Sequence, residues 1–160
     1  MKTLKLLVLS ILVFTIHLNS NAQNPKTNES NEAIINGLYQ SFGKGDVPAV
    51  LALMDPKVVW NEAESNTLAV GNPYVGPEAV VNGVFARIGE LYQSFTLKDI
   101  KIHGMDDNQV LATLYYVITS KKGEVYNVQA AHHWSLNEDG KIVKFQQYAD
   151  TKKLAEAGVK

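Results

Sequence analysis

Residues 110–150, VLATLYYVITSKKGEVYNVQAAHHWSLNEDGKIVKFQQYAD, indicate the architecture of this chain better than any other part of it. Three long runs rich in β-branched and aromatic residues are separated by short clusters of turn-forming residues, at 121–123 and 137–140. Runs and turns of this kind are typical of antiparallel strands with tight connections. We therefore predict a three-stranded meander whose polar and aromatic residues lie where a curved sheet would carry a pocket.

The residues before this meander predict three helices and two further strands. Apolar residues recur at helical spacing from Ile34 to Phe42, and Gly43 and Gly45 supply a stop signal. The same kind of pattern gives the other expected elements: helices over 47–54 and 77–91, strands beginning at Val58 and covering 95–103, and a loop rich in Gly, Asn and Pro over 65–76. The fold class is predicted to be α+β.

The amino terminus has the pattern of a secretory signal peptide over residues 1–22. Lys2 and Lys5 precede an apolar run over 6–16, and Ser20 and Ala22 occupy the small-residue positions before a cleavage site. A membrane anchor is the alternative, but a spanning helix needs roughly 20 apolar residues and polar residues interrupt this run. We expect cleavage after Ala22, export to the periplasm or out of the cell, and no stable membrane anchor.

The mature chain is expected to be one globular domain. Residues 23–29 are polar and predict a flexible leader, 30–154 form the domain, and 155–160 form a C-terminal tail. Hydrophobic residues make up 46% of the chain and charged residues 19%, which is a globular composition. Without Lys2 and Lys5, 13 basic and 16 acidic residues leave a net charge of −3, which argues against nucleic acid as a partner. The absence of cysteine excludes disulfides, a thiol nucleophile and a lipid anchor on cysteine.

Short motifs in a fixed order carry a resemblance to a known family. They are Leu38-Tyr39, Phe42, Gly45-Asp46, Val58-Val59-Trp60, Gly76-Pro77-Glu78-Ala79-Val80, His133-Trp134, Asp139-Gly140-Lys141-Ile142, Tyr148 and Asp150-Thr151. From about Ser30 to about Leu154, the chain resembles the SnoaL-like, polyketide-cyclase-like branch of the nuclear transport factor 2-like or ketosteroid isomerase-like superfamily. The resemblance implies a cone formed by a strongly bent antiparallel sheet around three helices, with a pocket at the open end. It also implies frequent dimerisation through the outer sheet face.

The resemblance leaves the activity open, because the superfamily contains isomerases, cyclases, dehydratases, epoxide hydrolases and members without catalysis. Its enzymes commonly work without a cofactor. In them a carboxylate or an imidazole moves a proton inside a mainly apolar cavity, and a hydrogen-bond donor stabilises the developing oxyanion. We therefore expect no cofactor here.

Candidate site residues can be grouped by strand alternation, because successive side chains of a strand point to opposite faces. On the last strand Gln146, Tyr148 and Asp150 share a face if no bulge intervenes. Asp150 as acid or base with Tyr148 as phenol donor would suit proton abstraction next to a carbonyl. The alternative is that Asp150 caps the strand end and pairs with Lys152 or Lys153, while Tyr148 packs at the cavity mouth.

On the preceding strand, His132 and Trp134 share one face and His133 lies on the other. His132 is the choice for the pocket if Trp134 is also inside. A histidine on a mainly apolar strand is more often a hydrogen-bonded core residue than a catalyst, so both roles stay open. The two adjacent histidines diverge across the sheet and no metal-ligand spacing is present, so we expect no metal.

The first strand offers a third group, because alternation places Trp60, Glu62 and Glu64 on one face. Trp60 would form an aromatic wall and Glu62 is the second choice for an acid or base. The alternative places Trp60 in the core and the glutamates at the solvated rim. Tyr74 is expected to belong to a lid.

Two functions of different classes follow from these residues. The first is an exported, cofactor-independent acid–base enzyme of isomerase, cyclase or dehydratase type, acting on a small apolar carbonyl compound through Asp150, Tyr148, His132 or Glu62. The second is a non-catalytic domain that binds a ligand or partner, with Trp60, Tyr74, Trp134 and Gln146 at the ligand. A homodimer is expected in either case.

Overall fold

The computed structural model describes residues 25–158, with side chains described from Asn31 onward. The expected signal peptide over 1–22 lies outside the described residues. Helix α1 covers Pro25–Gly43, so the chain is already helical within the expected leader. At the other end α5, Thr151–Ala157, continues past the predicted domain end at Leu154, because Ala157 as well as Leu154 is buried.

The elements follow the predicted order of two helices, a strand, a helix and a meander. They are α1, α2 (Val47–Ala52), β1 (Met54–Asn61), the 3-10 turn η1 (Thr67–Gly71), β2 (Tyr74–Val75), α3 (Pro77–Val80), the π-helical turn η2 (Val81–Phe85), α4 (Ala86–Leu91), β3 (Tyr92–Met105), β4 (Gln109–Ser120), β5 (Val125–Leu136), β6 (Ile142–Ala149) and α5. The predicted third helix is thus one continuous element with a π-helical turn in its middle. The short helix α5 is not predicted by the sequence patterns.

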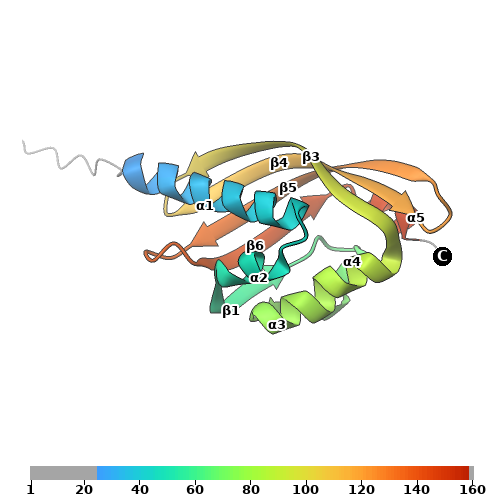
Figure 1. The fold of residues 1–160 in the computed structure, drawn as a ribbon, viewed down its shortest axis with the longest axis horizontal. Coiled ribbons are helices and arrows are strands. Elements are labelled where there is room, and N and C mark those ends of the chain that lie inside the picture. The colour runs from blue at the N-terminus through green and yellow to red at the C-terminus, as the bar shows by residue number, and fades with distance from the viewer. Residues whose placement is uncertain (1–24, 159–160) are drawn as a thin grey trace, which may run out of the picture.

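The strands form one curled, unclosed sheet in the order β2-β1-β6-β5-β4-β3. The meander from β3 to β6 is antiparallel, as predicted, whereas β1 joins the edge of β6 as a parallel neighbour. Helix α1 packs against β3 and β4, and the α3–α4 segment lies against β1 and β3 (Figure 1). The predicted α+β cone with helices inside a bent sheet is therefore confirmed. Among the described helices, none is both long and apolar enough for a membrane span.

Alternation along β4 and β5 separates the core face from the outer face. In β4 the buried series includes Leu114, Tyr116 and Ile118, and in β5 it includes His132 and Trp134. Period-two burial is what a sheet with one packed face requires. The inner face of these two strands consequently carries three polar side chains, Tyr116, Ser120 and His132, among apolar ones.

Strand β6 breaks this alternation near its start. Ile142 is buried, but the next buried residues are Phe145 and Gln147, because the register with β5 shifts between the pairs Leu136–Ile142 and Ser135–Lys144. A one-residue irregularity of this kind exchanges the two faces of everything that follows. Phe145 and Gln147 therefore face inward.

Tyr74 fixes the segment between β1 and α3. Its hydroxyl donates to the carbonyl of Leu68 at 2.6 Å, and its ring packs where side chains at Gly71 and Gly83 would stand. A Cβ on Gly83 would lie 2.0 Å from the Cε1 atom of the Tyr74 ring. The two glycines are therefore needed for the close approach of the ring.

We expect Gly83→Ala to lower the free energy of unfolding by about 1–3 kcal/mol, because the ring must leave its site. Gly89→Ala is the matched control: no neighbouring atom lies within 4 Å of its Cβ position, and helix propensity favours alanine by up to about 1 kcal/mol. Urea unfolding of both variants measures the difference. Equal midpoints for the two variants would show that the Tyr74 packing does not stabilise the fold.

Candidate functional site

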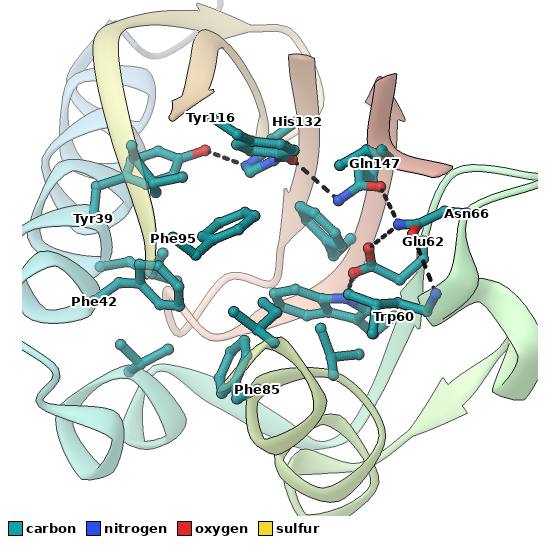
Figure 2. A pocket seen from close by; sticks show the side chains of 18 of the residues that line it. Tyr39, Phe42, Trp60, Glu62, Asn66, Phe85, Phe95, Tyr116, His132 and Gln147 are labelled. Carbon is teal, nitrogen blue, oxygen red and sulfur yellow. Dashed lines mark hydrogen bonds between the residues drawn. The ribbon is translucent and has the colours of Figure 1, made fainter. Parts of the chain in front are cut away.

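A pocket lies between the inner face of the sheet and the helices (Figure 2). Its deep wall is aromatic and buried, with Trp60 from β1, Trp134 from β5 and Phe145 from β6 in mutual ring contact. Its outer part is made of half-buried apolar side chains, namely Phe42, Phe85, Ile88, Phe95 and Leu97. The polar groups are few, and they lie at the inner end.

Glu62 is the buried carboxyl group of this pocket, with 2% of its surface exposed. It follows β1 directly, and alternation puts it on the side of Trp60, whose Nε1–H donates to Oε1 of Glu62 at 2.7 Å. Burial raises the pKa of Glu62 to about 7, although the hydrogen bond from Trp60 opposes this shift. The carboxyl group can therefore gain or lose a proton near neutral pH.

Two amides connect Glu62 to the strands behind it. Asn66 Nδ2 donates to Oε2 of Glu62 at 3.0 Å and to Oε1 of Gln147 at 3.1 Å. Gln147 Nε2 in turn donates to the hydroxyl of Tyr116 at 3.0 Å. The amides thus join the carboxyl group from β1 to residues of β4 and β6 (Figure 2).

His132 continues this series of hydrogen bonds and lies between two tyrosines. Its Nδ1 contacts the hydroxyl of Tyr39 on α1 at 2.8 Å, and its Nε2 contacts the hydroxyl of Tyr116 on β4. Trp134 Nε1–H donates to the same Tyr39 oxygen at 3.0 Å. Burial lowers the pKa of His132 to about 3, so the imidazole is neutral near pH 7. It cannot serve as a cationic acid in this state.

Tyr92, at the start of β3, also lines the pocket and is 3% exposed. Its hydroxyl is buried and finds no hydrogen-bond partner among the described residues. Burial raises the pKa of Tyr92, and the charge of Glu62 raises it further. The phenol is consequently a neutral donor near the carboxyl group.

The cavity between these side chains has a volume of about 50 Å³. Pockets that hold drug-sized ligands usually measure roughly 300–1,000 Å³. A ring-sized ligand therefore enters only if side chains of the half-buried outer wall move aside. The polar groups from Glu62 to His132 are held by their hydrogen bonds and can stay in place. Within the described residues, no three acidic or histidine side chains are grouped as a metal site.

The structure brings together part of the predicted site. Trp60, Glu62, His132 and Trp134 all line the pocket, as alternation along β1 and β5 predicts. Glu64 is exposed. His133 lies on the opposite face and contacts the Gln109 side chain, so only one of the adjacent histidines faces the pocket.

The predicted group on the last strand is not in this pocket. Gln146, Tyr148 and Asp150 were expected on its inner face, but the register shift near Ile142 turns them away. Tyr148 is 57% exposed and lies with Asp150 in a depression on the outer face of the sheet. The side-chain amide nitrogen of Gln146 donates a hydrogen bond to the backbone carbonyl of Gln147. The alternative role of Asp150, as a capping residue that pairs with Lys152 or Lys153, describes its surroundings better.

Asp150 is the N-cap of α5: its carboxylate accepts from the backbone N–H of Lys153 at 3.2 Å and lies 3.8 Å from the Lys153 ammonium group. Tyr74 likewise does not line the pocket, and its hydroxyl donates a hydrogen bond to the Leu68 carbonyl. Both residues therefore stabilise local structure in this state of the protein.

We expect Asp150→Ala to lower the free energy of unfolding by about 0.5–2 kcal/mol, the usual cost of losing an N-cap. Asp150→Asn is the control, because asparagine caps helices equally well. Thermal unfolding measures the effect, and ligand affinity is expected to stay unchanged in both variants. A stable Asp150→Asn protein that has lost ligand binding or turnover would restore Asp150 as a site residue.

Sequence reasoning missed five polar residues of the pocket: Tyr39, Asn66, Tyr92, Tyr116 and Gln147. A signal existed for two of them. Tyr39 falls on the apolar stripe of α1 with Ile35, Leu38 and Phe42, and Tyr116 alternates with the buried Leu114 and Ile118. A phenol on an apolar stripe needs a buried partner, which points toward a polar pocket.

Comparison with known proteins agrees with this architecture. The family model of the SnoaL-like domain matches residues 35–145. No curated protein matches the chain significantly. A solved structure of an NTF2-like protein from Burkholderia thailandensis E264 shares 27% identity, covers 81% of this chain and 98% of its own, and superposes with a TM-score of 0.73.

Two more distant structures share the fold. TerC, co-crystallised with polyporic acid, is 21% identical, with 80% of this chain and 97% of TerC covered and a TM-score of 0.71. A candidate polyketide cyclase from Xanthomonas campestris pv. campestris is 18% identical, with 83% and 99% covered and a TM-score of 0.68. At these identities the likeness concerns the fold alone.

Proposed function

Since the chain belongs to the SnoaL-like domain family of the nuclear transport factor 2-like superfamily, we propose that it binds a small, mainly apolar carbonyl compound and moves a proton on it without a cofactor. Glu62 is the proposed acid and base. The observation that carries the proposal is a buried carboxyl group, with a pKa of about 7, at the inner end of an apolar pocket.

The chemistry needs a base that is half ionised near the working pH. A group with a pKa near 7 combines a useful ionised fraction with enough basicity to take a proton. The Glu62 carboxylate would accept the proton from the carbon next to the carbonyl, and the C–H electron pair would form an enolate. Return of that proton to a second atom of the same ligand completes an isomerisation and restores the carboxylate.

The fold comparisons support the ligand class in general terms. One similar structure is a candidate polyketide cyclase and another was crystallised with polyporic acid. The lining of the pocket supports it in particular, because aromatic and aliphatic side chains form nearly all of its surface. An apolar ligand with few oxygens matches such walls.

Solvent exchange tests the proposal without knowledge of the natural substrate. Small ketones, from cyclohexanone to 1-tetralone, are incubated with the protein in D₂O, and deuterium at the carbon next to the carbonyl is followed by NMR. We expect exchange above the buffer rate for at least one ketone. Saturable ketone binding without exchange would contradict the catalytic proposal and leave a binding domain as the function.

We also propose that the chain is exported after cleavage behind Ala22 and forms a homodimer. The segment pattern of residues 1–22 supports export. The family resemblance supports a dimer through the outer sheet face, where Tyr115 and Tyr148 are both exposed large hydrophobics. Native mass spectrometry of the protein from cell fractions measures the mature mass and the subunit count together. An uncleaved or monomeric protein would contradict the respective proposal.

A further inference from the structure

The hydrogen-bond directions in the pocket can be assigned from backbone donors. The N–H of Leu68 donates to Oδ1 of Asn66 at 3.1 Å, and the N–H of Ala63 donates to Oε1 of Gln147 at 3.2 Å. Backbone N–H groups cannot reverse their direction, so both amide oxygens are fixed. The amide nitrogen of Gln147 must therefore face Tyr116 as a donor.

At Tyr39, at the other end of this series of hydrogen bonds, the direction is fixed by Trp134. Trp134 Nε1 is only a donor, and it points at the oxygen of Tyr39 at 3.0 Å. Each of the two tyrosine oxygens thus receives one hydrogen bond from outside, Tyr116 from Gln147 and Tyr39 from Trp134. Neither of these outer partners can accept a phenol proton.

Between the two phenols lies one neutral imidazole. Tyr39, His132 and Tyr116 together carry three exchangeable protons, two on the phenols and one on the ring. Only two hydrogen bonds join them, Tyr39–His132 and His132–Tyr116. One phenol proton is left without an acceptor among the described residues.

The position of this spare proton depends on the histidine tautomer. With the ring proton on Nδ1, His132 donates to Tyr39 and accepts from Tyr116, so the O–H of Tyr39 is spare. With the ring proton on Nε2, the directions reverse and the O–H of Tyr116 is spare. Both tyrosines line the pocket, so the spare donor is available to a ligand at either place.

Tyr92 gives an independent indication of the same kind. Its side chain is almost completely buried in the pocket, and its hydroxyl lacks a partner among the described residues. A buried hydroxyl without a partner costs about 1–3 kcal/mol, and a ligand that accepts its hydrogen bond would remove this cost. The pocket therefore offers two unmatched donors.

We infer that the ligand places acceptor oxygens, of the carbonyl or enolate type, against the Tyr92 hydroxyl and against one phenol of the Tyr39–His132–Tyr116 triplet, and that the tautomer of His132 selects which phenol donates. This inference rests on the proposed ligand class, but it does not require catalysis by Glu62. His132 acts as a positioning residue. It directs a neighbour's proton, because both of its ring nitrogens are used by the two phenols.

The tautomer is measured by ¹⁵N NMR of protein labelled at histidine. In Tyr116→Phe the only remaining phenol partner of the ring is Tyr39, and a buried N–H facing a phenylalanine ring would be unsatisfied. The ring proton is therefore expected on Nδ1. In Tyr39→Phe the same reasoning places it on Nε2. Identical tautomers in the two variants, or a doubly protonated His132 at neutral pH, would overturn the inference.

Ligand preference is measured with two probes of the same shape, cyclohexanone and methylenecyclohexane, of which only the ketone has an acceptor oxygen. We expect the wild-type protein to bind the ketone more tightly, and Tyr92→Phe to reduce the ratio of the two affinities by a factor of about 2–10, as for one net hydrogen bond. Phe95→Leu, which alters the outer wall, serves as the control and should change both affinities in parallel. No preference for the ketone in the wild-type protein would overturn the assignment.

The two proposals can fail separately. Opposite tautomers and a ketone preference without deuterium exchange would leave the inference standing and remove the catalytic function. Exchange that depends on Glu62, together with identical tautomers in the two variants, would leave the function standing and remove the inference.

Discussion

Glu62→Gln is expected to slow ketone deuterium exchange by a factor of about 10²–10⁴, the usual contribution of a positioned acid or base. The substitution keeps the size of the side chain, and its amide oxygen can still accept from Trp60, which now donates at 2.7 Å. What it removes is the group that takes the proton. Exchange measured as kcat/KM by NMR in D₂O gives the ratio directly.

The pH profile adds a second signature to this expectation. A base must be ionised to act, so exchange by the wild-type protein should rise with pH and level off above the pKa of about 7. The Gln variant should lack this rise. Glu62→Asp keeps a carboxylate one methylene further back and should retain part of the rate.

Glu64→Gln is the matched control, because Glu64 lies two residues away and is exposed. Its exchange rate and pH profile should equal those of the wild-type protein. An unchanged rate in Glu62→Gln, in a protein that still binds the ketone, would eliminate Glu62 as the base.

Two buried groups, Glu62 and His132, should each make the free energy of unfolding depend on pH, and Glu62 makes the first of these contributions. Its ordinary pKa is 4.5 and burial raises it to about 7, so the folded protein holds this proton more tightly. The contribution of this raised pKa to the free energy of unfolding is fully present below pH 4.5 and is lost as the pH rises through about 7. At roughly 1.4 kcal/mol per pH unit, the loss is on the order of 3 kcal/mol.

His132 makes the second contribution, with the opposite sign. Burial lowers its pKa from 6.5 to about 3, so its contribution is present above pH 6.5 and is lost as the pH falls toward 3. Between pH 4.5 and 6.5 the two slopes oppose each other in the wild-type protein. The pair should therefore add little net pH dependence in that window.

Glu62→Gln separates the two contributions. Relative to the wild-type protein, the variant should gain about 3 kcal/mol as the pH rises from 4.5 to about 7, because the wild-type protein alone loses the benefit of a neutral side chain. Urea unfolding at several pH values measures this difference, with Glu64→Gln as the reference. Parallel curves for Glu62→Gln and wild type would show that the carboxyl pKa is not raised by folding.

The sequence predicted the parts of the site that depend on uninterrupted alternation. Trp60 and Glu62, and likewise His132 and Trp134, are two residues apart with no register shift between them, and all four line the pocket. The roles assigned to them stay predictions. Glu62 ranked behind Asp150 because a charged residue next to a loop is usually solvated. Only the structure shows that Trp60, Asn66 and their neighbours enclose it.

The remaining errors have physical causes that a single sequence does not display. The faces of β6 were exchanged by the register shift after Ile142. Asp150 is the N-cap of the short helix α5, which the sequence analysis did not predict, and its position after a strand favoured a site interpretation instead. Tyr39 and Tyr116 lie on different elements, and their common contact with His132 depends on how α1 packs on the sheet.

The irregularity at the start of β6 also bears on how proteins of this architecture diverge. Deletion of a single codon at Val143 would remove the extra residue between the pairs Leu136–Ile142 and Ser135–Lys144 and would restore regular alternation. Phe145 would still pair with Trp134 and Gln147 with His132, so both side chains would stay in the interior. Loss of one residue at this rim is thus absorbed by the bulge, so descendants can differ in length here and keep the same chemical groups in the interior.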